Sequence, residues 1–334
     1  MGEDCPGAVR IVAEDRIEAL TSTSAAEDID WLTDADVADK LRDLVQNSTA
    51  WLGARRTGRF SLAGAQPKTA LLFRDGRWGD PHGSAPTTHI IKPAVIGLDE
   101  HDLNEHLCLA AMREAGIPAA RTRVERFEDQ TAIVVQRYDR RRGSAGSFTR
   151  IHQEDMAQAL GYHPADKYQN EGGPGARDIA ALLRRVMPAD QAREDSERFL
   201  QALVWNWIIA GSDAHAKNYS ILLLGQQVAL APFYDISSAL PYPDMPLQKL
   251  KLAMKFGSSY KMNPVDKPWA KLASDVGLRE SRVVEIAEDL LQRTVPAFEV
   301  AAADEDVRAL GSKLPQRMIE LVADRVETCR RLAK

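Results

Sequence analysis

A change of pattern near residue 147 is the feature that most constrains how this chain can fold. Before it, short apolar runs bounded by turns favour strands, namely 69–73, 87–93 and 131–136. After it, apolar residues recur at helical spacing, most clearly over 178–187, 194–210, 281–293 and 314–332. The sequence therefore predicts an α+β, bilobal protein with a small mixed α/β N-lobe and a mostly helical C-lobe. We expect a ligand in a crevice between the lobes.

The segment boundaries follow from local signals. Thr33 to Asp36 reads as a capping box that starts a helix, and the helix predicted over 99–115 ends at Gly116. We expect three parts: an N-terminal appendage (1–58), an N-lobe (59–138) and a helical C-lobe (139–334).

Composition excludes several classes of protein. With 44% hydrophobic and 27% charged residues among 334, the chain is neither fibrous nor disordered. The 43 Lys and Arg against 48 Asp and Glu give a net charge of −5, which argues against a basic nucleic-acid binder. Three distant cysteines (Cys5, Cys108, Cys329) make no disulfide scaffold or CxxC metal motif. The acidic N-terminus lacks the order of a signal peptide, and we expect a cytoplasmic protein.

The strongest chemical signal is a loop after the predicted buried helix. Asp213 is followed five residues later by Asn218, and Asp235 comes just beyond the next two predicted strands. Phosphoryl transfer uses one carboxylate to accept the hydroxyl proton, and an amide oxygen with a second carboxylate to hold Mg²⁺. The alternative is structural, with Asp213 in a turn, Asn218 at a strand start and Asp235 solvated.

Lys92 gives a second signal, because it closes an apolar strand and would suit the phosphates of ATP. Glu105 lies on the apolar stripe of the helix 99–115 and would need a cationic partner, for which Lys92 is the candidate. Glu100 competes for that role, and an ordinary surface pair is the alternative. The loop from Ser61 to Lys68 could cradle phosphate with backbone amides, or could be a plain hairpin turn.

Several motifs together resemble the HipA family of bacterial serine/threonine kinase toxins. They occur in the family's order over about 60–260: SLAGAQPKT (61–69), THIIK (88–92), NEH (104–106), RYDR (137–140), KYQ (167–169), GGP (172–174), DAHAKN (213–218) and FYD (233–235).

The resemblance implies a protein-kinase-like fold that uses ATP and Mg²⁺, with Asp213 as catalytic base and Asn218 and Asp235 as metal ligands. It implies autophosphorylation of Ser61, which displaces the loop over the phosphates and silences the kinase. The residues that it assigns to the nucleotide are Ala63, Gly64, Ala65, Gln66, Pro67, Lys68, Lys92, Gln136, Arg137, Tyr138, His215, Lys217, Asn218, Tyr234 and Asp235. Of these, the resemblance implies that residues 136–138 are the hinge that contacts the adenine.

The chain departs from the family pattern in two places. Only about sixty residues precede the loop, as in the shorter HipT-like kinases, whose missing subdomain is a separate small protein. Gln136 stands where an acidic residue is common, which bears on adenine binding if the side chain is used. The resemblance also implies a HipB-like helix-turn-helix antitoxin, indirect contact with DNA through it, and an aminoacyl-tRNA synthetase as substrate.

Three functions fit these residues. The first is a protein kinase that acts as the toxin of a type II toxin–antitoxin system. The second is a small-molecule ATP-dependent phosphotransferase, because the Asp–Asn–Asp set does not depend on which molecule carries the hydroxyl. The third is an inactive nucleotide-binding partner of a DNA-binding antitoxin.

Overall fold

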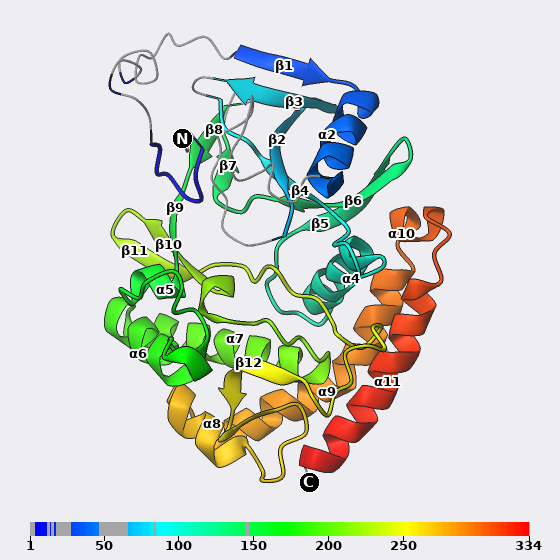
Figure 1. The fold of residues 1–334 in the computed structure, drawn as a ribbon. Helices are drawn as coiled ribbons and strands as arrows, with labels where there is room; N and C mark the ends of the chain where they lie inside the picture. Colours follow the sequence, from blue (N-terminus) through cyan, green and yellow to red (C-terminus); the bar gives the residue numbers. More distant parts are fainter. Residues whose placement is uncertain are drawn as a thin grey trace. The chain divides into compact units, whose positions relative to one another are not determined.

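The computed structural model describes residues 4–11, 14, 17, 28–46, 66–82, 85–143 and 147–333. The chain forms two compact units, the first made of 1–103 with 121–153 and the second of 104–120 with 154–334 (Figure 1). These boundaries differ from the predicted ones at 58 and 138, because the chain enters the second unit at 104, leaves it at 121 and returns at 154.

The first unit is built on one antiparallel sheet whose strand order is β1-β3-β2-β4-β6-β5. The strands are β1 (Asp28–Leu32), β2 (Thr69–Arg74), β3 (Arg77–His82), β4 (His89–Pro93), β5 (Thr122–Phe127) and β6 (Gln130–Gln136). The predicted strands at 69–73, 87–93 and 131–136 are confirmed as β2, β4 and β6. The turn between β2 and β3 needs the left-handed conformation at Asp75 and Gly76.

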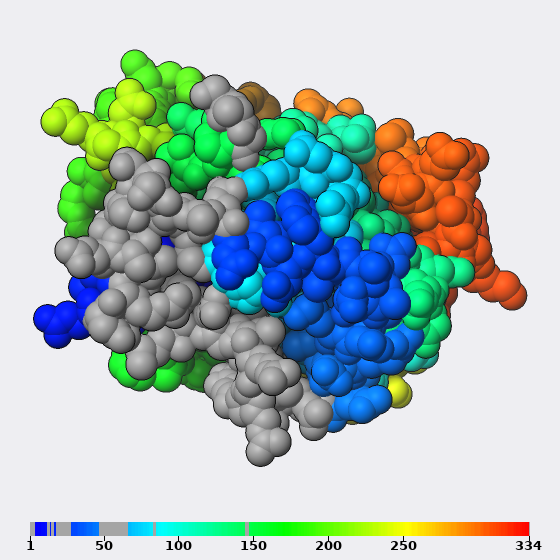
Figure 2. Space-filling view, turned by 90° about the horizontal axis from the view of Figure 1, so that it is seen from above, coloured from blue at the N-terminus to red at the C-terminus, as the bar shows by residue number. Residues whose placement is uncertain are grey.

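Helix α2 (Asp34–Gln46) covers one face of this sheet (Figure 1). Its start is the predicted capping box: the Thr33 backbone N–H donates to Asp36 Oδ2 at 2.8 Å, and the Asp36 N–H donates to Thr33 Oγ1 at 3.3 Å. Val37, Leu41 and Leu44 pack in the core of the sheet with buried residues of β2, β3, β4, β5 and β6. Residues 28–46 are therefore an integral part of the unit rather than an appendage, with edge strand β1 and helix α2 at its surface (Figure 2).

The second unit is mostly helical, as predicted. Its helices are α4 (His101–Glu114, which begins in the first unit's segment), α5 (Met156–Ala159), α6 (Ala176–Val186), α7 (Ala189–Ile208), α8 (Trp269–Val276), α9 (Glu280–Ala302), α10 (Glu305–Ala309) and α11 (Leu314–Ala333). The helix α7 is the core element, because one run of its residues, from Ala202 to Ile208, is buried throughout. Trp207 stacks on Phe256 with ring centroids 4.7 Å apart.

Small sheets and short 3-10 helices complete the chain. The strands are β7 (Arg140–Arg142), β8 (Phe148–Arg150), β9 (His152–Asp155), β10 (Ser220–Leu224), β11 (Gln227–Leu230), β12 (Lys251–Phe256) and β13 (Ser259–Lys261), and the 3-10 helices are η3 (Gln169–Glu171) and η4 (Ala216–Asn218). Strands pair as β7-β8, β11-β10-β9 and β12-β13. Among the described residues, no helix has the length and apolar character that a bilayer crossing requires.

Candidate active site

The loop that follows α7 is fixed at its start by the helix itself. The Gly211 backbone N–H donates to the carbonyl of Asn206 at 2.8 Å. A Cβ on Gly211 would lie 2.3 Å from Asn206 Oδ1, so a larger residue there would have to displace the buried Asn206 side chain. The buried helix thus determines where the next residues, 212–218, leave the core.

Asp213 and Asn218 belong to one hydrogen-bonded turn. The Asp213 carbonyl accepts from the His215 N–H and from Asn218 Nδ2, each at 2.8 Å. The Asp213 side chain is 67% exposed, whereas Asn218 is buried. Because Asn218 donates its NH₂ group to the backbone, its amide oxygen remains as the acceptor of that side chain. The turn therefore holds one carboxylate and one amide side chain close together.

Tyr168 and His215 lie beside the Asp213 carboxylate. Tyr168 Oη donates to Asp213 Oδ1 at 2.7 Å, and His215 Nε2 lies 4.0 Å from Asp213 Oδ2. The rings of Tyr168 and His215 meet edge to face, with centroids 5.1 Å apart. Burial raises the pKa of Tyr168, and its hydrogen bond to Asp213 adds to that rise. The KYQ motif contains Tyr168, but sequence reasoning assigns it no role.

Asp235 shares the electrostatic environment of this turn. Burial lowers the pKa of His215, and the carboxylates of Asp213 and Asp235 both oppose that shift. Asp235 has a left-handed backbone, with φ of 57°. Two residues earlier, the Phe233 N–H donates to the carbonyl of Pro118 at 3.0 Å, and the Phe233 carbonyl accepts from the N–H of Ala120 at 2.8 Å. Asp213 and Asp235, the two carboxylates that the sequence predicts to act together, therefore both interact electrostatically with His215.

The donor set fits Mg²⁺. An amide oxygen on Asn218 and a carboxylate on Asp235 are hard oxygen ligands, and Mg²⁺ completes its shell with water and phosphate oxygens rather than an all-protein cage. Within the described part of the chain, no group of three or more His, Cys, Asp or Glu residues could hold a metal.

Lys217 and Tyr234 serve the loop itself. Lys217 Nζ donates to Asp155 Oδ2 at 2.9 Å, and Asp155 also caps α5 through Gln158. Tyr234 Oη donates to the Lys217 carbonyl at 2.8 Å. The sequence predicts both residues as nucleotide contacts, which stays a prediction. In the structure, these two bonds hold η4 in place.

Asn104 belongs to the NEH motif, but sequence reasoning assigns it no role. Its Nδ2 donates to the Ser238 carbonyl at 2.7 Å, and its Oδ1 accepts from the Ser238 N–H at 3.0 Å. This paired contact ties α4 to the segment that follows Asp235. The neighbouring Glu105 is 1% exposed, and its ion pair with Lys92 stays a prediction.

In the first unit, Lys92 lies on the sheet face opposite α2. Ile91 and its register partner Val134 belong to the core under α2. Side chains alternate along a strand, so Lys92 and its partner Ile133 lie on the other face. Lys92 is 5% and Lys68 3% exposed, and Gln66 Nε2 donates to the Pro93 carbonyl at 3.4 Å.

The remaining predicted loop residues, Ser61, Ala63, Gly64 and Ala65, lie outside the described residues. Pro67 is half-buried next to Lys68. The phosphate-binding role of this loop therefore stays a prediction from the family resemblance.

The predicted hinge contains one side chain with a different task. Gln136 is exposed and Tyr138 half-buried, but Arg137 is buried. Arg137 donates to Asp139 through Nε at 3.0 Å and Nη2 at 2.9 Å, and Nη1 lies 3.2 Å from Asp4 Oδ2. Its guanidinium is thus occupied within the first unit, and a contact with adenine would have to use the backbone.

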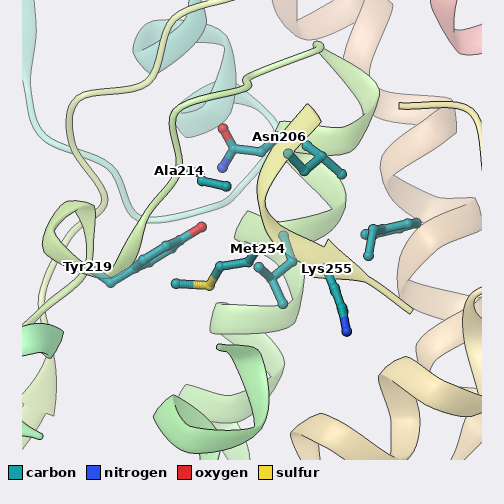
Figure 3. Close-up of a pocket in the computed structure, with 9 residues that line it drawn as sticks. Asn206, Ala214, Tyr219, Met254 and Lys255 are labelled. Carbon is teal, nitrogen blue, oxygen red and sulfur yellow. The ribbon is translucent and has the colours of Figure 1, made fainter. Parts of the chain in front are cut away.

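A small cavity lies behind the loop rather than at its exposed face (Figure 3). Its volume is about 10 Å³, the space of a single water molecule. Its lining includes Asn206, Ala214, Tyr219 and residues 252–256 of β12. This cavity is far too small for a nucleotide, so it is not the substrate site.

Comparisons with known proteins place this chain in a family. The profile of the HipA-like C-terminal domain matches residues 60–298. The Sinorhizobium fredii protein named "Putative kinase Y4mE" is 33% identical over 334 residues, covering 99% of this chain and 77% of that protein. The serine/threonine-protein kinase toxin HipA of Shewanella oneidensis is 27% identical over 68% of this chain and 54% of its own length.

Solved structures show the same fold. HipA in the complex of Shewanella oneidensis HipA, HipB and operator DNA gives a TM-score of 0.78 at 22% identity, covering 96% of this chain and 75% of that one. The Helicobacter pylori kinase CtkA gives 0.51 at 10% identity, covering 79% of this chain and 93% of that one.

These comparisons show that the protein has a kinase-like fold. More specifically, the chain belongs to the HipA family. The predicted family and fold class are confirmed.

Proposed function

We propose that this protein is an ATP- and Mg²⁺-dependent serine/threonine protein kinase that acts as the toxin of a type II toxin–antitoxin system. The observation that carries the proposal is the turn in which exposed Asp213 and buried Asn218 are hydrogen-bonded. His215 lies beside Asp213, and the Asp213 and Asp235 carboxylates both act to raise its pKa. Kinship with proteins named as kinases supports it.

In this proposal, Asp213 is the catalytic base. It accepts the proton of the incoming serine hydroxyl while the serine oxygen bonds to the γ-phosphorus of ATP and the bond from that phosphorus to the ADP oxygen breaks. Tyr168 holds one carboxylate oxygen by its hydrogen bond, which leaves Oδ2 for the substrate hydroxyl. Asn218 and Asp235 would hold Mg²⁺, which neutralises phosphate charge when bound. Lys92 and the loop ending at Lys68 would contact the phosphates, and residues 136–138 the adenine.

The finer assignments rest on the family. We propose an aminoacyl-tRNA synthetase as substrate, autophosphorylation of Ser61, and a cytoplasmic location where ATP is supplied. The structural relative was crystallised as a complex of HipA, HipB and operator DNA, which supports a HipB-like antitoxin that brings this acidic chain to DNA. We also propose that a separate small protein binds this chain.

Labelled ATP and Mg²⁺ test the proposal. We expect the purified protein to transfer label to Ser61 and to a cellular protein, and Asp213→Asn to lose at least about 10²-fold of that rate, because the hydroxyl proton has no acceptor. Asp166→Asn, an exposed aspartate nearby, is the matched control and should keep full activity. Label found only on a metabolite would favour the small-molecule phosphotransferase, and ATP binding without transfer would favour the inactive partner.

A further inference from the structure

The segment 249–271 carries a charge opposite to that of the whole chain. It contains six lysines and one aspartate, Asp266, whereas the chain has a net charge of −5. The lysines are Lys249, Lys251, Lys255, Lys261, Lys267 and Lys271. Such a local concentration of positive charge creates a field that attracts anionic partners.

Strands β12 and β13 place three of these lysines on one hairpin. Leu252, Met254 and Phe256 of β12 are buried, while the two lysines that alternate with them, Lys251 and Lys255, are exposed. In the register of the hairpin, Lys251 lies directly opposite Lys261 of β13. Like charges in directly opposed positions destabilise a sheet, so the hairpin bears a cost that folding alone does not explain.

No carboxylate of the described part of the chain forms an ion pair with Lys251, Lys255 or Lys261, although Lys271 pairs with Asp275. Lys255 Nζ lies 5.4 Å from the centre of the Tyr260 ring. In Figure 3 its ammonium nitrogen points away from Tyr219 and Ala214. The 3-10 helix η3, which packs on β12, carries the exposed Glu171.

This hairpin adjoins the loop that carries Asp213. The Ala253 N–H of β12 donates to the carbonyl of Ser212 at 3.1 Å, one residue before Asp213. The Lys255 N–H donates to Gln169 Oε1 at 2.7 Å. Gln169 follows Tyr168, whose Oη is bound to the Asp213 carboxylate. The lysine surface and the proposed base are thus parts of one hydrogen-bonded assembly.

We propose that Lys251, Lys255 and Lys261 form a docking surface for an acidic segment of the protein substrate, next to the serine that is phosphorylated. The inference rests on the proposed kinase function and adds a substrate class to it: a serine flanked by aspartate or glutamate. Carboxylates on the substrate would neutralise the opposed lysines and steer the serine toward Asp213.

Two synthetic peptides test this proposal with the full chain. Each contains one serine, flanked in one peptide by Asp and Glu and in the other by Asn and Gln. At low salt we expect the wild type to prefer the acidic peptide by about ten-fold in kcat/KM, which is what three exposed ion pairs supply. In the triple variant Lys251→Gln, Lys255→Gln, Lys261→Gln, the ratio should fall to about one, with the neutral peptide as internal reference.

The matched control removes the same charge from another surface. The triple variant Arg308→Gln, Lys313→Gln, Arg317→Gln changes exposed cations of the α10–α11 region and should keep the preference. Circular dichroism of both variants verifies folding, and the single variant Lys251→Gln, which should lose about a third of the logarithmic preference, provides the test if the triple variant unfolds.

The outcomes separate the two hypotheses. A wild type that labels Ser61 but phosphorylates both peptides equally, or a lysine variant that keeps the ratio, would overturn the docking proposal alone. A wild type that labels neither itself nor any protein would overturn the kinase function. A short single-stranded RNA that binds through the same lysines, without any preference for the acidic peptide, would assign the surface to nucleic acid instead.

Discussion

Tyr168 is the residue whose contribution to the site is most directly measurable. Its hydroxyl is the hydrogen-bond donor to Asp213 Oδ1, so its removal lets the carboxylate rotate. We expect Tyr168→Phe to reduce kcat about ten-fold at unchanged KM for ATP, because orientation of the base matters and nucleotide binding does not depend on this contact. Steady-state kinetics provide the measurement, and exposed Tyr162→Phe is the control. An unchanged or higher kcat would show that the hydroxyl does not orient the base.

His106 makes stability depend on pH. Burial lowers its pKa from 6.5 to about 4, so the unfolded chain binds a proton in this interval while the folded chain does not. The free energy of unfolding therefore decreases as pH falls from 6.5 toward 4, by about 1.4 kcal/mol per pH unit from this histidine. Urea titrations at several pH values should show a shallower dependence in His106→Gln than in the wild type.

Exposed His163→Gln serves as the control for that change. A pH dependence of unfolding that is equal in His106→Gln and in the wild type would contradict the assignment to His106.

For single residues, the sequence predicts only those site contacts that are made between near neighbours along the chain. Asp213 and Asn218 lie in one short turn, so their separation along the chain defines their separation in space. Tyr168, Asn104 and Asp155 join the site only through folding, and their partners are 45 to 134 residues away. No pattern within a single segment reports such contacts.

Among elements, α2 connects the early residues to the rest of the first unit. Leu41 is fully buried in the core of the sheet. We expect Leu41→Ala to lower the free energy of unfolding by about 2–5 kcal/mol, since it removes buried methyl groups and leaves a cavity. Asp43→Ala on the exposed side of the same helix should change it by less than about 0.5 kcal/mol. Similar effects of the two variants in chemical denaturation would mean that α2 does not belong to the core.

The elements that sequence reasoning finds are those with long or strongly apolar patterns. Helices α7 and α11 and strands β4 and β6 are of this kind. Strand β1 has the acidic sequence DIDWL and is mostly exposed, so its pairing with β3 gives no apolar signal. Strand β12 does have an alternating sequence, with apolar residues inside and lysines outside. That alternation indicates a strand, but it extends over only six residues.

For the molecule as a whole, the N-terminal segment is anchored far along the chain. Burial alone would raise the pKa of Asp4, but Arg137 and Arg140 lower it below the usual value. Arg140 Nη2 donates to Asp4 Oδ1 at 2.8 Å, and Arg150 Nε to the same oxygen at 3.1 Å. The Gly7 N–H donates to Asp139 Oδ2 at 2.7 Å. Buried charges of both signs thus join the first and last parts of the first unit.

Removal of Asp4 should leave Arg137 and Arg140 without one of their two buried carboxylate partners, Asp4 and Asp139. We expect Asp4→Ala to lower the free energy of unfolding by about 3 kcal/mol. Asp30→Ala, which removes a largely exposed partner of His82, should cost less than about 1 kcal/mol. Thermal unfolding monitored by circular dichroism distinguishes the two, and equal losses would indicate that the anchor contributes no more than a surface pair.

This anchor also affects the order of events during translation. The residues that bind Asp4 and Gly7 are among the last of the first unit to leave the ribosome, and the strand that pairs with β4 ends only at Gln136. At a synthesis rate of about 5–20 residues per second, Asp4 and Gly7 wait roughly 7–30 s for their partners. If the proposed toxin activity is correct, a growing cell has that interval before a nascent chain can assemble a nucleotide-binding lobe.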